Sequence, residues 1–419
     1  MNTFNAARYG WLGFALAMLG IPLYVYLPTY YAQQSSLSLT AVGSALLVAR
    51  TFDVITDPLI GWLSDRLHAT FSRTKQLFVS SGFLIIGVYQ LWLPDLTTMS
   101  WWSLFFWSFV TYLAWTSIAI PYLAMSAEIS RDDHQKSVLA SFREGFAIVG
   151  VLLVLSLPLV SGFGAQQSEF YQLLFMVFLV ALITGLLVLI KLPALTMQPV
   201  IPDSPWRLIK QLWQQERQVF QIMPSYLLNN LANALPATLF LIFVSDYLQL
   251  EAQTGQFLFV YFAAGLLSLP IWIQLAKRFG KYPTWQASML FASLSFIGVF
   301  FLNAGDATGF MVISVLTGFS LGIDVAMPAS IQADLTQKIE SQQSTGLLFG
   351  LWGMLTKLAL ALAVGLAFPI LEWSQSLELS SQQIGFNPTD LTLLLLYAGL
   401  PILLKLWSWS LLRALCKPE

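Results

Sequence analysis

The chain alternates between long apolar stretches and short polar segments. Windows of mostly apolar residues, each about 20 residues long and so able to span a bilayer as a helix, fall near 8–31, 39–64, 76–94, 100–127, 137–161, 170–192, 219–247, 254–276, 284–302, 308–333, 344–371 and 391–413. The longest polar stretch separates the sixth window from the seventh. We therefore predict an all-α membrane protein with twelve transmembrane helices in two six-helix bundles, residues 1–192 and 219–419, joined by a linker at 193–218.

The linker contains a short amphipathic segment. After Pro199, Pro202 and Pro205 its sequence reads WRLIKQLWQQERQ, in which Trp206, Ile209, Leu212 and Trp213 recur at helical spacing. Apolar residues at this spacing on an otherwise polar segment are typical of a helix that lies in the membrane interface. We predict such a helix here.

Composition supports the membrane assignment and excludes other classes. The chain is 57% hydrophobic and 10% charged, whereas soluble domains carry about 25% charged residues. Its net charge of -1 provides no basic face for nucleic acid. Its one cysteine, Cys416, excludes an internal disulfide framework and a thiolate zinc site.

Charged residues between the predicted spans indicate the orientation. Lys and Arg collect in alternate connections, for example at Arg73, Lys277 and Arg278, while the other connections hold acids such as Asp95 and Glu251. Cytoplasmic loops carry the excess of basic residues. We therefore expect both termini in the cytoplasm and the chain in the inner membrane.

The two halves of the sequence resemble each other. The fourth window ends IPYLAMSAEISRDD and the tenth ends MPASIQADLTQKIE, so that Pro121 precedes Glu128 as Pro328 precedes Asp334. Transporters built from two related bundles place the substrate site between them near the bilayer midplane. The repeat therefore predicts a transporter that works by alternating access.

The second predicted span carries a stripe of charged residues. Arg50, Asp53 and Asp57 share one helical face, which continues through Gly61 to Asp65. Ionisable groups within a membrane span are functional candidates, and one arginine cannot neutralise two carboxylates. We therefore predict a site for a transported cation. The structural alternative is that Arg50 neutralises one aspartate and the group staples two helices together.

This stripe resembles a known family motif. The pattern R-x-x-D-x-x-x-D-P-x-x-G-x-x-x-D, from Arg50 through Pro58 to Asp65, is similar to the second helix of the glycoside-pentoside-hexuronide:cation symporters, the melibiose permease group of the major facilitator superfamily. IPYLAMSAEISRDDHQKSVLASFREGF and ADLTQKIESQQSTGLLFGLWGMLTKLALAL resemble further regions of that family. The resemblance covers essentially the whole chain and implies the major facilitator fold and cation-coupled symport.

The resemblance also implies roles for individual residues. It assigns a sodium or proton site to Asp53 and Asp57, with the hydroxyls of Thr56 and Thr116 as further ligands, since hard cations prefer oxygen. For the solute, the resemblance implies binding roles for Arg143 and Lys357. Two departures weaken a galactoside site: Ala119 replaces an aspartate of the melibiose permease, and no acid lies between Trp11 and Tyr31.

Four further polar residues within predicted spans are candidates for solute binding. Asp324 either faces the cavity as a substrate-linked or proton-linked carboxylate or forms a buried pair with Lys357. Asn229 and Asn233 either hydrogen-bond a polar solute or join neighbouring helices. Tyr24 either stacks on a sugar or anchors the helix end at the membrane interface.

Gly61, Asp65 and Arg66 match the start of the superfamily's loop signature, G-x-x-x-D-R. The resemblance implies that Asp65 and Arg66 latch the two halves together on the cytoplasmic side. This would be a gating role and not a binding role.

Together these features predict a cation-coupled symporter for a small organic solute, either a sugar or glycoside or, alternatively, an amphipathic lysolipid or fatty-acyl compound. We expect a monomer with the solute, the cation and the bilayer as its partners and no cofactor beyond the transported Na+ or H+. The sequence pattern does not indicate an enzyme, because no span holds a nucleophile with its base or a His/Cys metal cluster. A non-transporting membrane sensor is the remote alternative.

Overall fold

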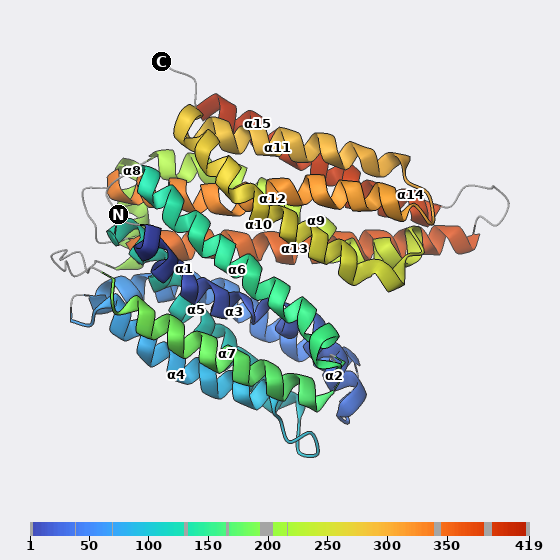
Figure 1. Ribbon diagram of the computed structural model, residues 1–419, viewed down its shortest axis with the longest axis horizontal. Coiled ribbons are helices and arrows are strands. Elements are labelled where there is room, and N and C mark those ends of the chain that lie inside the picture. The colour runs from blue at the N-terminus through green and yellow to red at the C-terminus, as the bar shows by residue number, and fades with distance from the viewer. Residues whose placement is uncertain are drawn as a thin grey trace. The chain divides into compact units, whose positions relative to one another are not determined.

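The computed structural model describes residues 3–37, 39–68, 70–129, 133–164, 167–192, 204–215, 217–338, 345–380 and 388–415. The first part of the expected linker and Cys416 lie outside these ranges. The α-helices are α1 (Thr3–Ala17), α2 (Leu27–Gln34), α3 (Leu39–His68), α4 (Arg73–Trp92), α5 (Trp101–Ile129), α6 (Asp133–Ser161), α7 (Ser168–Leu189), α8 (Pro205–Gln215), α9 (Arg217–Ile242), α10 (Thr254–Phe279), α11 (Lys281–Ile297), α12 (Ala307–Lys338), α13 (Thr345–Ser380), α14 (Pro388–Leu394) and α15 (Leu400–Leu415). The architecture of the described residues is thus all-helical, as predicted (Figure 1).

Ten helices among the described residues are long and apolar enough to cross a membrane. The predicted spans 39–64 and 76–94 form α3 and α4, which are not among these ten. The count of twelve spans therefore stays a prediction. The surface segment of the linker is also helical, as α8, with Trp206 and Trp213 exposed.

The chain divides into two compact units. The first contains residues up to Gln214 together with Ala329–Met354, and the second contains Gln215–Pro328 and the residues from Leu355 onward. The helices α12 and α13 therefore each contribute to both units.

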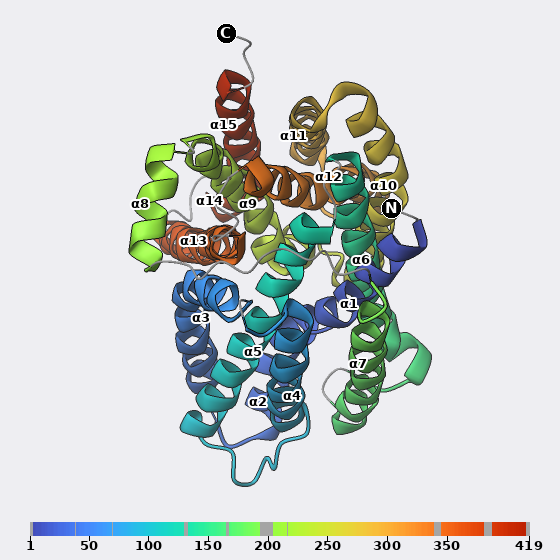
Figure 2. The ribbon, with the colours of Figure 1, turned by 90° about the vertical axis from the view of Figure 1, so that its left-hand side faces the viewer.

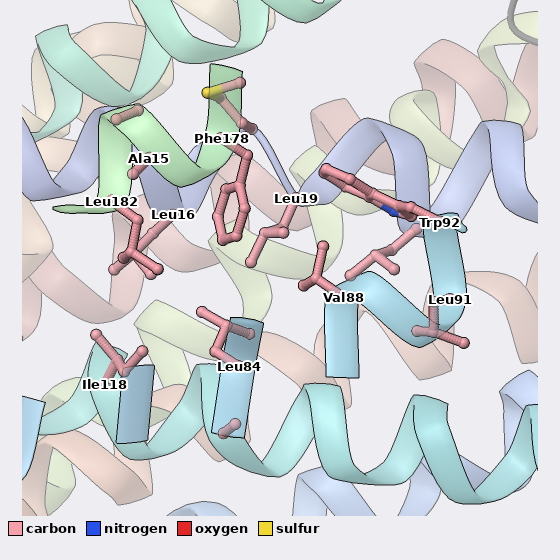
Figure 3. Close-up of a cluster of buried hydrophobic side chains, with 14 of the residues drawn as sticks. Ala15, Leu16, Leu19, Leu84, Val88, Leu91, Trp92, Ile118, Phe178 and Leu182 are labelled. Carbon is pink, nitrogen blue, oxygen red and sulfur yellow. The ribbon is translucent and has the colours of Figure 1, made fainter. Parts of the chain in front are cut away.

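In the first unit, α1 packs on α6 and α7, and α4 packs on α5 and α7. Figure 3 shows the core that results, in which Leu19, just after α1, Val88 of α4 and Phe178 of α7 point toward one another. Lipid tails are as apolar as these side chains, so close van der Waals packing, and not removal of apolar surface from water, holds such helices together.

In the second unit, α15 packs against α9 and α11 (Figure 2). The ring of Phe243 stacks on the ring of Tyr397 with centroids 3.9 Å apart, and Phe310 contacts both. Short π-helical segments occur at Pro22–Tyr26 in the first unit and at Phe243–Tyr247 in the second. π-helical turns often lie at functional sites, and the first of these carries Tyr24.

Candidate functional site

The charged stripe of α3 is buried. The exposed fraction is 5% for Asp53 and 1% for Asp57. The hydroxyl of Thr116 on α5 donates a hydrogen bond of 2.8 Å to Asp53 Oδ1. The hydroxyl of Thr56 instead donates to the backbone carbonyl of Asp53 at 3.1 Å. The structure thus brings Asp53 and Thr116 together across two helices, while the Thr56 side chain bonds to its own helix.

Arg50 lies against an aromatic group. Its guanidinium carbon is 4.2 Å from the centroid of the Tyr24 ring, a cation–π geometry. Tyr24 in turn stacks against Tyr112 and Trp115 of α5, with ring centroids 6.1 Å apart in both cases. Tyr24 therefore packs against α5 and against Arg50. These contacts within the protein distinguish it from a tyrosine that only anchors a helix end at the membrane interface.

Asp57 lies where α3 approaches the first turns of α13 closely. A Cβ atom added to Gly353 would be 2.8 Å from Asp57 Oδ2, and one added to Gly350 would overlap the Asp57 backbone. A side chain at Gly61 would overlap the backbone of Gly346. Small residues at such crossings let membrane helices approach closely. The glycines of α13 thus fix the surroundings of Asp57.

The stripe presents oxygen donors in a region of low exposure. Two carboxylates and the Thr116 hydroxyl are the ligand types that hard cations take. Within the described ranges no group of three or more His, Cys, Asp or Glu side chains is arranged to hold a metal ion. The stripe therefore offers carboxylate and hydroxyl oxygens of the kind that a hard cation could use.

Asp65 caps the start of α13. Its carboxylate accepts hydrogen bonds from the backbone N–H groups of Gly346 and Leu347, at 2.7 and 2.9 Å. Negative charge at a helix N-terminus is favourable because the first N–H groups of a helix have no partner within it. The carboxylate is also 2.7 Å from the guanidinium of Arg73, which reaches Glu128 of α5 at 2.9 Å. We call Asp65, Arg73, Glu128 and the start of α13 the latch.

Arg66 does not join the latch. It is exposed and lies over the ring of Trp62, 5.4 Å from its centroid. Arg73, which our sequence reasoning used only for orientation, provides the cation instead. It could have been found as a base in the first turn of a predicted helix, within a few residues of Asp65.

A second buried ion pair lies in the same unit. Lys136 of α6 is 1% exposed, and its Nζ is 2.9 Å from Oδ1 of Asp334 on α12. The hydroxyls of Ser137 and Ser330 lie 3.0 Å apart beside it. In the sequence, the internal repeat aligns Asp334 with Glu128. In the structure, each of these acids forms an ion pair with a base near the start of another helix, Asp334 with Lys136 and Glu128 with Arg73. The pairing itself was not predicted.

Asp324 pairs with Lys405 and not with Lys357, so the pairing suggested from sequence is wrong. Lys405 Nζ of α15 is 2.6 Å from Asp324 Oδ2 and 3.1 Å from Asn229 Oδ1. Ser288 of α11 donates to the other carboxylate oxygen at 2.7 Å. Both charged side chains are at most 3% exposed. Lys405 stands alone in an apolar window, and that signal could have identified it.

The remaining candidates are spread over the two units. Arg143 of α6, in the first unit, forms an ion pair with the adjacent Glu144. Lys357 and Asn233, in the second unit, are half-buried on α13 and α9. Asn229, which is fully buried, is held by Lys405. Asn229 and Asp324 thus both contact Lys405, a residue that the sequence analysis did not identify.

A family model described as "MFS/sugar transport protein" matches residues 8–414. The chain belongs to this family. Its similarity to bacterial symporters agrees: over 153 residues it is 33% identical to the "Putative glycoside/cation symporter YagG" of Escherichia coli, covering 34% of this chain and 32% of that protein. Membership in the glycoside-pentoside-hexuronide:cation symporter family, expected from the α3 motif, is confirmed.

Other relatives of this MFS/sugar transport chain match over a longer region. It is 22% identical over 431 residues to the "Sodium-dependent lysophosphatidylcholine symporter 1" of Gallus gallus, covering 91% of this chain and 80% of that protein. By contrast, the matches to bacterial symporters span about a third of those proteins' length.

Solved structures show the same fold. A bacterial homologue of the iron transporter ferroportin superposes with a TM-score of 0.71 at 15% identity, covering 99% of both chains. The chain therefore has the fold of these solved transporters, which agrees with its membership in the MFS/sugar transport family.

Proposed function

We propose that this transporter couples the movement of Na+ or H+ to the movement of a small organic solute, with the cation bound at Asp53 and Asp57. The observation that carries the proposal is the burial of both carboxylates on α3 with the Thr116 hydroxyl 2.8 Å from Asp53. Burying a carboxylate in a membrane protein is costly unless a positive charge reaches it. A cation that binds there and leaves with the solute meets this requirement.

The coupling requires alternating access between two related bundles, 1–192 and 219–419, with both termini in the cytoplasm and the 193–218 linker between the bundles. In this scheme the latch closes one entrance and must open in each cycle. Twelve spans in a single copy of the chain suffice for the transport cycle.

A glycoside or related sugar is the first candidate for the solute. The family description and the name of the glycoside/cation symporter support it. Among the residues predicted from the sequence, Arg143 and Tyr24 of the first unit and, separately, Lys357 and Asn233 of the second unit are the candidates we assign to the solute. Asp324 and Asn229 are engaged by Lys405 instead. Arg143 and Tyr24 offer a guanidinium and an aromatic face, which suit hydroxyl groups and the apolar face of a sugar ring.

Replacement of the α3 carboxylates tests the cation site. We expect Asp53→Asn and Asp57→Asn each to abolish cation-dependent uptake into vesicles while the protein remains folded in the membrane. Unchanged cation dependence in both variants would refute the proposal.

The matched control is Asp95→Asn. Asp95 is an exposed loop carboxylate, and hydrogen bonds from the Thr97 side chain and backbone hold its pKa below its usual range, so it is ionised at neutral pH. This variant therefore removes one negative charge outside the spans and should leave uptake unchanged.

A lysolipid is the second candidate. The similarity to the lysophosphatidylcholine symporter extends over 91% of this chain. In addition, residue 119, one helical turn after Thr116 on α5, is an alanine and not an acid. Thermal-shift titrations of the purified protein with a panel of glycosides and lysolipids separate the two candidates. Stabilisation by lysolipids alone would replace the sugar assignment, and stabilisation by glycosides alone would retain it.

A further inference from the structure

A cavity of about 560 Å³ lies at one end of the first unit, outside the cation site and next to the latch. It is formed where α3 ends, α4 begins, and α5 and α7 end. Its polar wall consists of His68, Ser72, Arg73, Thr74, Lys75 and Glu128. The rest of its wall is apolar and comes mainly from α4, α5 and α7.

The polar wall has the features of a phosphate site. The cavity contains the first turn of the 20-residue helix α4, whose initial N–H groups have no partner within the helix. Ser72 precedes this turn without capping it through its side chain. Such helix starts bind phosphate through their N–H groups and dipole. The exposed Lys75 adds a positive charge in the same turn.

A histidine supplies a second, independent observation. The Nδ1 atom of His68 is buried and has no hydrogen-bond partner among the described residues. Buried polar atoms nearly always have a partner, and an exception calls for a bound group or water. An oxygen atom of a ligand in this cavity would provide the partner.

The charges already present limit what can bind. Arg73 is engaged by Asp65 and Glu128, at 2.7 and 2.9 Å, so it adds little free positive charge. Glu128 repels an anion from its own side of the cavity. A phosphate is therefore favoured beside Lys75 and Thr74, and electrostatic attraction alone is modest there.

The apolar wall supplies the rest of the interaction. Phe78 and Val79 of α4 and Ile190 after α7 line the cavity and are 39%, 53% and 55% exposed. α4 and α7 pack side by side (Figure 1), and their exposed apolar faces continue away from the cavity. A free phosphate would leave this wall uncovered, whereas an acyl chain would cover it.

We propose that this cavity binds the phosphate group of a membrane phospholipid, with the headgroup at the start of α4 and an acyl chain along α4 and α7. Basic pockets between membrane helices at the headgroup level are suited to phospholipid headgroups. The site is distinct from the solute site and does not depend on the identity of the solute.

The test uses the full chain, purified and delipidated in detergent, with dioctanoyl phosphatidylglycerol as the probe. Binding is read by thermal shift and by adducts in native mass spectrometry. We expect the lipid to bind, Lys75→Gln to weaken its apparent affinity about fivefold, and Lys75→Arg to retain it. Adding His68→Phe to Lys75→Gln should weaken binding by about a further fivefold through the lost hydrogen bond.

The control is Lys277→Gln, which removes an exposed cation from the last turn of α10 and should leave the affinity unchanged. Equal weakening by Lys277→Gln and Lys75→Gln would overturn the proposal, because any basic surface would then suffice. Binding of sodium phosphate as tight as that of the lipid would also overturn it, in favour of a free anion site. Equal binding of dioctanoylglycerol would overturn it in favour of a purely apolar groove.

Discussion

At the scale of single residues, two buried carboxylates of this chain have contrasting neighbours. Asp53 accepts a hydrogen bond from the hydroxyl of Thr116, while Asp324 lies 2.6 Å from the ammonium of Lys405. The Lys405 ammonium neutralises the Asp324 carboxylate, and both side chains are at most 3% exposed. This arrangement suits a permanent link between α12 and α15.

We therefore expect Asp324→Asn to destabilise the protein, because it leaves Lys405 buried without its opposite charge. Breaking one partner of a buried pair costs about 3–5 kcal/mol in soluble proteins. The double variant Asp324→Asn with Lys405→Met should recover most of this loss. Thermal unfolding in detergent measures the cycle, and a double variant no more stable than Asp324→Asn would contradict the assignment of a structural pair.

At the scale of helices, the crossing of α3 with α13 determines the surroundings of Asp57. Backbone atoms of Gly61 and Gly346 meet there, and Gly350 faces Asp57. Any side chain at these positions must push the helices apart. The position of a buried carboxylate therefore depends on residues that have no side chain of their own.

Gly61→Val tests this crossing. Overpacking costs about 1–3 kcal/mol, and here we also expect uptake to fall at least about tenfold as α13 moves away from Asp57. The matched control is Gly43→Ala on the same helix, where an added Cβ meets no atom within 4 Å. Vesicle uptake and thermal unfolding measure both variants. Equal uptake by Gly61→Val and the control would show that the close approach is not needed.

The sequence predicted the helices well because apolar windows of span length leave little choice of structure in a bilayer. Resemblance to the family grouped Asp53 and Thr116 as cation ligands, and the structure places the Thr116 hydroxyl 2.8 Å from Asp53, while the cation site itself stays a prediction. The sequence failed for pairs between different helices: Lys405 was missed as the partner of Asp324, and Arg73 was missed as the partner of Asp65. Such pairs depend on how helices rotate and tilt against one another, which helical periodicity along one segment does not determine.

At the scale of the whole molecule, the proposed alternating-access cycle would require the latch to break and form again. Asp65 contributes two hydrogen bonds to the start of α13 and an ion pair with Arg73. Charge-assisted hydrogen bonds contribute about 1.5–3 kcal/mol each. Under the proposed mechanism, interactions of this size would favour the form in which the latch is closed and could still be broken during a cycle.

We expect Asp65→Asn to expose buried residues of the first unit. Ser330, which is 1% exposed, can be replaced by cysteine in a Cys416→Ser background. Labelling of Ser330→Cys by a maleimide should then become several-fold faster when Asp65→Asn is added. Arg66→Gln, which alters an exposed neighbour outside the latch, serves as the control. Equal labelling rates with and without Asp65→Asn would show that the contacts of Asp65 do not keep this region closed, and would contradict a gating role for the latch.

The meeting of Gly61 with Gly346 also has a consequence for inherited variation. Every missense change of a glycine codon adds atoms, so no amino-acid replacement at either position can be accommodated without displacing a helix backbone. Homologous genes should therefore accumulate silent substitutions at these two codons while amino-acid replacements there are removed by selection.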